Sequence, residues 1–339
     1  MAESITKAEI QARLVRYPDL RPCTTAFIDT RTPGSEKKEN FTIIGPGVAE
    51  NPDQFVHIDI PHGFNIGGAR QPPGCVNSQH SHETAEVFVV QRGRWRFTVG
   101  EKGQDAFVDL EPGDTISIPT HVFRGFTNVG NELGFLFAVL GGDDPGRVTW
   151  APYVFEQAAH HGLVLLENGR LIDTQAGEQV PTDVAPMTAT TSEDVEKLSR
   201  LSTEELAKCV VRTSEMNTNA EQLEGWSGIT EAPIIGEASI KENRASGKLS
   251  WPHGFHVRRL VFEPGAETDF YRREEAEVIM MHEGTLHYCW PEGDLLLETG
   301  DVLTSPIGTN RRYRNMSMDQ TVVYVVRGTN TPQGFLAPN

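Results

Sequence analysis

Residues 74–93 read GCVNSQHSHETAEVFVVQRG, and residues 265–284 read GAETDFYRREEAEVIMMHEG. The first Gly and the Ala-Glu-Val triplet recur at one offset, since 265 − 74 = 191 and 277 − 86 = 191. A Pro-His-Gly-Phe segment precedes each copy, at 61–64 and 252–255, with the same offset. An ungapped offset over such a length indicates an internal duplication.

The two copies differ at the positions where a metal could bind. The first copy has His80, His82 and Glu86, whereas the second has Tyr and Arg in place of the two His and keeps the Glu. Residues at even spacing on a strand share a face, so the three side chains are expected to converge. Two imidazoles and one carboxylate suit iron, manganese, nickel or zinc, and they are also the ligand set of non-haem Fe(II) oxygenases. We therefore predict one divalent transition metal, Fe(II) in preference to Mn, Ni or Zn, in the first copy alone.

The repeat continues downstream with a shorter offset. Gly113-Asp114 matches Gly300-Asp301, and Arg124 matches Arg311, so that 300 − 113 = 187. Between the repeated positions the chain alternates short apolar runs with Gly, Pro, Asn and Asp. Many short strands with frequent turn residues predict an all-β sandwich or barrel in each copy.

The chain is expected to fall into four segments. They are a helical arm at 1–40 with its helix within 5–17, a first barrel at 41–145, a connector at 146–230 and a second barrel at 231–339. The connector is expected to hold a helix at 152–161, a hairpin turned at Asn168-Gly169, and a helix running from the Ser202–Glu205 capping box to Val211.

Charge and composition limit the partners. Lys and Arg number 30 against 47 Asp and Glu, a formal charge of −17, which disfavours nucleic acid and anionic membranes. No apolar run approaches a membrane span, and four scattered cysteines fit a reducing compartment, so a cytoplasmic protein is expected. We expect a small anionic substrate and a homo-oligomer.

The two repeated motifs resemble those of the cupin superfamily, and both are compared in the first copy. In the first motif, Gly74 is followed after five residues by His80-Ser-His82, then by Glu86 and Gly93, and the fit is complete. In the second, Gly113, Pro119 and Asn128 fit, but Arg124 stands where the family usually has a fourth metal ligand, a His. The resemblance implies a bicupin, with two double-stranded β-helix barrels of jelly-roll type. It also implies distant similarity to gentisate-type ring-cleaving dioxygenases.

Three interpretations of Arg124 are open. It could bind a substrate carboxylate beside a three-ligand metal. It could pair with Glu86 and occupy the place of the metal. It could point elsewhere and leave His121 to supply the missing ligand, although residues three apart on a regular strand face opposite ways. In the second copy, the matching Arg311 is expected to join Tyr271, Arg273 and Glu277 in a polar cluster without metal.

His62 recurs as His253 in the second copy. It is therefore either a pocket base or a hydrogen-bonding residue at the start of a strand. With Arg124 and His62 as candidate catalytic residues, the leading hypothesis is a metal-dependent dioxygenase acting on a small carboxylate, with aromatic acids among the candidates. The alternatives are a metal-dependent decarboxylase or isomerase of a small acid, and a non-catalytic binding cupin.

Overall fold

The computed structural model describes residues 5–240, 243–331 and 333–338. Contacts within the chain group it into two units. The metal-motif unit comprises Arg21–Asp59 and Asn65–Val210. The second-repeat unit comprises the described residues up to Leu20, Ile60–Phe64 and those from Val211 on. Each copy of the repeat therefore has its own packed body.

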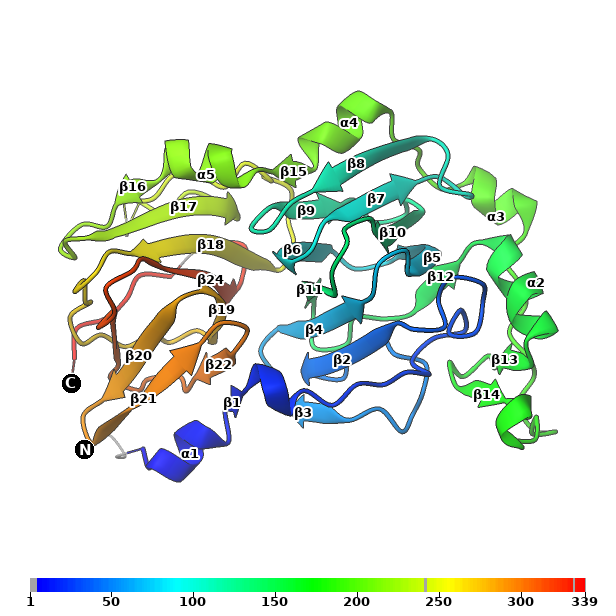
Figure 1. Ribbon diagram of the computed structural model, residues 1–339, viewed down its shortest axis with the longest axis horizontal. Coiled ribbons are helices and arrows are strands. Elements are labelled where there is room, and N and C mark those ends of the chain that lie inside the picture. The colour runs from blue at the N-terminus through cyan, green and yellow to red at the C-terminus, as the bar shows by residue number, and fades with distance from the viewer. Residues whose placement is uncertain (1–4, 241–242, 332, 339) are drawn as a thin grey trace. The chain divides into compact units, whose positions relative to one another are not determined.

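Two β-sheets form the body of the metal-motif unit (Figure 1). One has the strand order β15-β9-β6-β11-β4-β2-β3, and the other has the order β12-β5-β10-β7-β8. Their bounds are β2 Glu39–Ile44, β3 Val56–Ile58, β4 Phe64–Gln71, β5 Val76–His82, β6 Glu86–Arg92, β7 Trp95–Val99, β8 Ala106–Leu110, β9 Thr115–Ile118, β10 Arg124–Asn128, β11 Gly134–Gly141, β12 Val148–Trp150 and β15 Val210–Val211. Phe88 of one sheet meets Phe97 and Phe126 of the other, with ring centroids 5.2 Å apart in both pairs. Such apolar contacts between the sheets make the core of the predicted all-β sandwich.

The second-repeat unit is built in the same way. Its sheets have the orders β1-β22-β19-β24-β18-β17-β16 and β21-β20-β23. The bounds are β1 Leu14–Val15, β16 Glu221–Gln222, β17 Ile229–Ile235, β18 Phe255–Phe262, β19 Glu277–Glu283, β20 Thr285–Trp290, β21 Gly293–Glu298, β22 Val302–Ser305, β23 Arg312–Arg314 and β24 Thr321–Gly328. Tyr288 and Tyr313 of the smaller sheet lie in one apolar core with Leu260 and Val323 of the larger.

The bounds of the strands confirm the internal duplication that the sequence predicts. Adding 191 to the bounds of β4 and β6 gives those of β18 and β19. Adding 187 to the bounds of β9 and β11 gives those of β22 and β24. Positions that match in sequence therefore hold matching places in the two folds.

The N-terminal helix is shorter than predicted. Helix α1 spans Lys7–Gln11, capped by Thr6 and Glu9, and the 3-10 helix η1 follows β1 at Tyr17–Asp19. The apolar spacing continued past α1 because Leu14 and Val15 form a strand that pairs with β22 of the second-repeat unit. The helix opened by Ser202 is also short, because α4 ends at Lys208 and the next residues form β15. There Ser117 N donates to Cys209 O at 3.0 Å, so this segment extends the sheet of the metal-motif unit.

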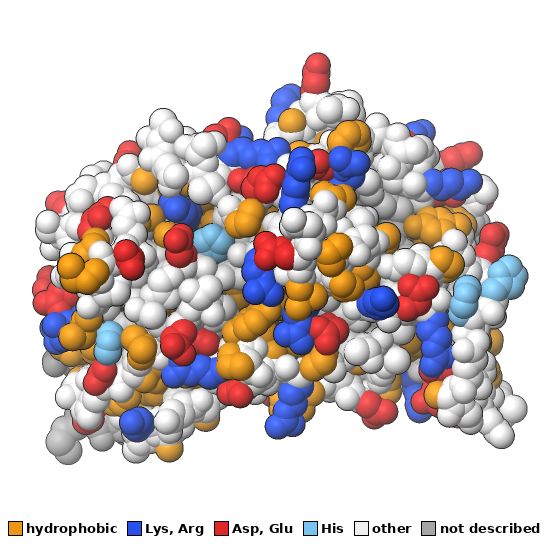
Figure 2. Space-filling view, viewed as in Figure 1, with side chains coloured by type: hydrophobic (Ala, Val, Ile, Leu, Met, Phe, Trp, Pro, Cys, Tyr) orange, Lys and Arg blue, Asp and Glu red, His pale blue; other side chains and the backbone are white. Residues whose placement is uncertain are grey.

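The rest of the connector follows the prediction closely. Helix α2 spans Pro152–His160, and β13 Leu163–Leu165 pairs with β14 Leu171–Asp173 around Asn168-Gly169. The remaining helices are η2 Thr174–Ala176, α3 Ser192–Glu196 and α5 Thr213–Asn219. No helix among the described residues is long and apolar enough to cross a membrane. On the face drawn in Figure 2, Asp and Glu lie interspersed with Lys and Arg, so the acidic excess is not gathered there into one patch.

Candidate metal centre

The two sheets of the metal-motif unit bring the three predicted ligands together. His80 and His82 lie on β5 with one residue between them, so both point to the same face. Glu86 begins β6 in the other sheet, where it is held opposite Ile118 and Leu140. The turn between β5 and β6 thus carries the chain from one sheet to the other and leaves the three side chains facing each other in the interior.

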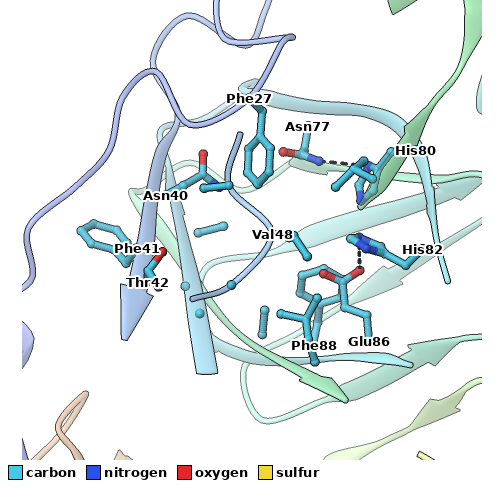
Figure 3. Close-up of a pocket in the computed structure, with 18 of the residues that line it drawn as sticks. Phe27, Asn40, Phe41, Thr42, Val48, Asn77, His80, His82, Glu86 and Phe88 are labelled. Atoms are coloured by element: carbon cyan, nitrogen blue, oxygen red, sulfur yellow. Dashed lines mark hydrogen bonds and ion pairs between the residues drawn. The ribbon is translucent and has the colours of Figure 1, made fainter. Parts of the chain in front are cut away.

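The geometry of this cluster suits one metal ion. One ligand atom from each of His80, His82 and Glu86 lies within 4.8 Å of the others, and all three residues are buried (Figure 3). His82 Nε2 lies 3.2 Å from Glu86 Oε2. His80 Nδ1 lies 2.8 Å from the Ser78 carbonyl oxygen, a contact that fixes the proton on Nδ1 and leaves Nε2 as the free ligand atom.

The protonation states also suit a metal. Burial lowers the pKa of His80 to about 3, and the neighbouring His82 adds to the shift, so this imidazole is neutral at pH 7. Burial by itself raises the pKa of Glu86, but the His82 imidazole and the Arg124 guanidinium bring it down to about 2. A neutral imidazole and an ionised carboxylate are the forms that coordinate a divalent cation. His82 Nδ1 has no hydrogen-bond partner among the described residues, so one buried polar atom of the cluster can still form a polar contact.

A cavity opens beside the cluster. It has a volume of about 80 Å³, and His80, His82 and Glu86 form part of its wall. Phe27 and Trp150 line it as well, and the Trp150 ring lies 5.3 Å from that of His80. A cavity of this size admits a small molecule, because one water needs only about 10–15 Å³ on this measure.

Arg124 lies close to the cluster but not on the cavity wall. It is fully buried at the start of β10, in register with His80. Its Nη2 donates to the carbonyl oxygens of Ile118 and Pro119 at 3.1 and 3.0 Å. Its Nε and Nη1 have no hydrogen-bond partner in the part of the chain that the structure describes. Burial lowers the pKa of Arg124, and the Glu86 carboxylate opposes that shift. The guanidinium and the Glu86 carboxylate therefore interact through their opposite charges.

The structure does not bring His121 to the cluster. Its side chain is exposed, and its φ of 59° places it in a turn before β10 rather than on a strand. Its backbone N–H donates to the His82 carbonyl oxygen at 3.2 Å, so only the main chain meets the ligand strand.

His62 is also separate from the cavity. It belongs to the second-repeat unit, where its Nε2 lies 2.6 Å from the Thr304 hydroxyl, and its Nδ1 contacts the Ile60 carbonyl oxygen. These contacts correspond to the hydrogen-bonding interpretation. The equivalent His253 contacts the Trp251 carbonyl oxygen in the same manner.

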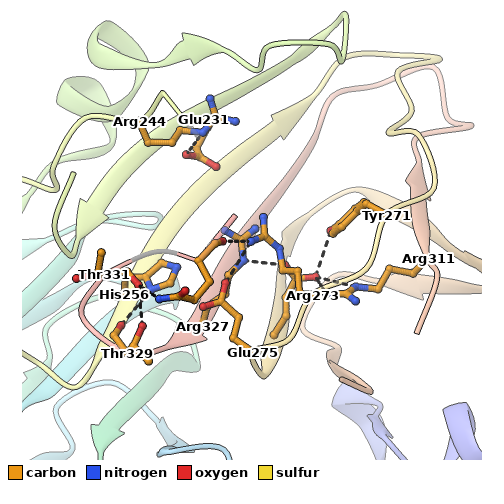
Figure 4. A network of polar contacts seen from close by, with 12 residues as sticks. Glu231, Arg244, His256, Tyr271, Arg273, Glu275, Arg311, Arg327, Thr329 and Thr331 are labelled. Carbon is orange, nitrogen blue, oxygen red and sulfur yellow. Dashed lines mark hydrogen bonds and ion pairs between the residues drawn. The ribbon is translucent and has the colours of Figure 1, made fainter. Parts of the chain in front are cut away.

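In the second repeat, arginines surround the carboxylate of Glu277, which matches Glu86. Figure 4 labels Arg273, Arg311 and Arg327 in this network. Glu277 Oε1 accepts from Arg311 Nη2 at 2.9 Å, and Oε2 accepts from Arg327 Nε at 2.7 Å. Arg273 Nε lies 3.1 Å from Oε2, and the Tyr271 hydroxyl donates to Oε1 at 3.2 Å. Burial favours the neutral acid, but the three guanidiniums hold the pKa of Glu277 well below its usual range. The predicted polar cluster is therefore present, and Arg327 is a further member of it.

Several residues around the metal cluster were not found from the sequence. Trp150 lies opposite His80 in the β12–β5 pairing, and its Nε1 donates to the buried Glu50 carboxylate at 2.7 Å. Asn77 contacts His80 Nδ1 at 3.3 Å. Trp150 is far from the motif in sequence, and only the pairing of β12 with β5 brings it there. Asn77 lies within the motif, but at a position that the motif leaves free.

Comparisons with known proteins agree with this arrangement. A family model described as a cupin domain matches residues 69–140, which contain all three ligands. No curated protein matches the chain.

Solved structures resemble the fold over nearly its whole length. Oxalate decarboxylase from Bacillus subtilis at pH 4.6 has a TM-score of 0.55 and 12% identity, over 96% of this chain and 78% of that one. A formate complex of the Lactobacillus farciminis oxalate decarboxylase has a TM-score of 0.55 and 10% identity, over 96% and 88%. A B. subtilis structure concerned with the Mn(II) centres of the enzyme has a TM-score of 0.54 and 13% identity, over 96% and 79%.

Residues 69–140 thus match a cupin domain, and the chain has the fold of a bicupin. The expected similarity to gentisate-type dioxygenases is not shown, and the solved structures named above are oxalate decarboxylases.

Proposed function

We propose that this protein is a metal-dependent bicupin enzyme that decarboxylates a small carboxylic acid in the metal-motif unit. His80, His82 and Glu86 would hold the metal. One observation carries the proposal, namely the three buried ligand atoms within 4.8 Å of one another on the wall of a cavity. The oxalate decarboxylases that share the fold support this reaction class over the dioxygenase.

The chain's own groups would have distinct tasks. His80 is oriented by its Nδ1 contact to the Ser78 carbonyl oxygen, and Glu86 supplies the negative charge of the ligand set. Phe27 and Trp150 would exclude water from the acid. When bound, a divalent metal supplies Lewis-acid polarisation of a substrate oxygen. Because only three ligands come from the protein, open positions remain for a substrate carboxylate.

Manganese is the first metal to test. The Mn(II) centres named for the B. subtilis enzyme support it, and Fe(II) remains the choice that the two-His, one-carboxylate set favours. That ligand set is also what keeps the dioxygenase as a second candidate.

The test begins with protein purified without chelator or imidazole and loaded with Mn(II) or, under anaerobic conditions, Fe(II). Each form is then given a panel of small carboxylic acids while CO2 release and O2 consumption are recorded. CO2 release without net O2 consumption, lost in His80→Ala, is the expected result. Consumption of O2 in step with product would favour the dioxygenase instead. Metal and acid binding without turnover on any panel member would favour the non-catalytic cupin.

A further inference from the structure

The cavity exists because the first repeat has small side chains where the second has large ones. Ala138 on β11 corresponds to Val325 on β24, and Leu140 corresponds to Arg327. In the second-repeat unit the space at these positions shrinks to about 10 Å³, with Val325 and Arg327 in its wall. In the metal-motif unit the corresponding space is about 80 Å³.

Gly67 widens the cavity further. It lies on β4 and corresponds to the buried Arg258 of β18. A Cβ placed on Gly67 would lie 3.9 Å from Ala138 Cβ and 3.3 Å from the Phe41 carbonyl oxygen. The missing side chain at 67 and the single methyl at 138 therefore leave room over the sheet that also carries Glu86.

Aromatic rings form much of the wall. They are Phe27, Phe41, Phe88, Phe126 and Trp150. The described residues that line the cavity include no Lys, Arg or Asp, and their one carboxylate is that of Glu86 in the ligand cluster. Figure 3 shows the cluster on one side of this space and Asn40, Phe41 and Thr42 of β2 on the other.

Neutral polar groups on the wall are few. The Thr42 hydroxyl donates to Gln54 Oε1, and Asn77 lies between His80 and Lys38. The Asn40 amide remains, with an Oδ1 that has no hydrogen-bond partner among the described residues. One neutral amide cannot compensate a buried carboxylate.

Two cations lie near the cavity without lining it. Lys38 Nζ lies behind the aromatic wall, 5.3 Å from the Phe27 ring centroid, and forms an ion pair with the fully buried Asp29. Arg124 is outside the lining and donates to two backbone carbonyls. The described wall therefore offers no guanidinium or ammonium group to the end of a substrate that points away from the cluster.

We propose that the substrate is a monocarboxylate whose remainder is uncharged and mainly apolar, and that the site discriminates against dicarboxylates such as succinate, whose second carboxylate would face the wall. This inference rests on the proposed function, because it assumes that the acid binds the metal through one carboxylate. The rest of the molecule would lie against Gly67, Ala138 and the aromatic wall. A second carboxylate there would lose its water without gaining a charged partner.

Two acids of the same shape separate the effect of charge from that of size. In 4-methylpentanoate an isopropyl group replaces the distal carboxylate of succinate. Calorimetric titration of the Mn(II)-loaded protein at pH 7.5 with each acid measures binding without any need for turnover. We expect 4-methylpentanoate to bind at least about tenfold more tightly than succinate. Ala138→Val, which copies the second repeat, should weaken 4-methylpentanoate and leave Mn(II) content unchanged, because the ligands lie on β5 and β6.

The outcomes separate the two proposals. Succinate binding as tightly as 4-methylpentanoate, or more tightly, would overturn this inference and leave the proposed function standing. Failure of the wild-type protein to load Mn(II), or to bind either acid, would overturn the proposed function and this inference with it. The comparison of acids uses wild-type protein, so it does not depend on the folding of the variant.

Discussion

Glu86 and Glu277 hold the same place in the two repeats, each as the first residue of its strand, yet different side chains face the two carboxylates. Glu86 faces two imidazoles that can share a metal, whereas Glu277 accepts hydrogen bonds from Arg311 and Arg327. A duplicated backbone has thus kept its central carboxylate while the groups that face it have changed. In the second unit internal guanidiniums supply the positive charge that a metal ion would supply in the first under the proposed function.

Metal content should be one ion per chain at most. His80→Ala should lose Mn(II), because two of the three ligands cannot hold it tightly. Tyr271→Phe, the matched change at the equivalent position of the second unit, should keep full content, because Arg273 and Arg311 leave no room for a cation beside Glu277. Elemental analysis after loading and desalting measures both. Two ions per wild-type chain would contradict the assignment of a single centre.

Glu277→Gln should destabilise the second-repeat unit strongly. The substitution removes the one negative charge that Arg273, Arg311 and Arg327 share in a buried site. Arg273 keeps its contact with Glu275, but Arg311 loses its carboxylate partner. Breaking a buried pair on one side costs about 3–5 kcal/mol. Urea unfolding followed by circular dichroism measures the loss.

Glu267→Gln is the matched control for that experiment. Glu267 pairs with Arg314 at 2.6 Å, but its side chain is 45% exposed. Exposed pairs contribute about 1 kcal/mol or less, so this variant should unfold close to wild type. Equal losses in the two variants would show that the Glu277 network has no special weight.

Stability should fall with rising pH through the ionisation of Glu50. Burial raises the pKa of Glu50 to about 8, although hydrogen bonds from Trp150 Nε1 and Ile28 N oppose the shift. Below the ordinary value of 4.5 both states are protonated, and between 4.5 and about 8 only the folded state keeps the proton. The contribution is therefore full below 4.5 and is lost as pH rises through about 8, at a slope of at most about 1.4 kcal/mol per pH unit.

Glu50→Gln tests this assignment, because the amide keeps the shape of the side chain and does not titrate. The unfolding free energy of wild type minus that of the variant should decrease from pH 5 to pH 8 and then level off. A difference that stays constant over this range would mean that Glu50 is ionised in the folded protein.

The sequence was most informative where spacing alone determines geometry. His80, His82 and Glu86 could be grouped because strand periodicity puts them on one face, and the repeat could be aligned because its offset is constant. Longer-range features were not visible. The pairing of Leu14 with Leu303 turned an expected helix into a strand, and Trp150 reaches His80 only through the β12–β5 pairing. His121 is exposed and does not reach the cluster. It lies in a turn with positive φ, where the alternation of side chains between the two faces of a strand no longer applies.

Arg124 should weaken metal binding through its charge. Its guanidinium is buried near the cluster and lowers the pKa of Glu86, so it stabilises the same carboxylate charge that a metal would use. Arg124→Met removes the positive charge of the guanidinium at similar side-chain volume and should tighten Mn(II) binding about tenfold. Arg124→His should tighten it further, because an imidazole at this position of β10, in register with His80, would add the fourth ligand of the usual cupin set. Competition with a metal-sensitive dye gives the dissociation constants.

Arg96→Met is the control for this last prediction, because Arg96 is 41% exposed and pairs with Asp109 rather than with any ligand. It should leave the Mn(II) dissociation constant unchanged. Arg124→Met also removes the donor to the Ile118 and Pro119 carbonyls, so its unfolding free energy should fall by about 1–3 kcal/mol and is measured separately. If a folded Arg124→Met binds Mn(II) no more tightly than Arg96→Met does, the guanidinium does not compete with the ion. Its role would then be confined to holding the β9–β10 turn, through the two carbonyls that it contacts.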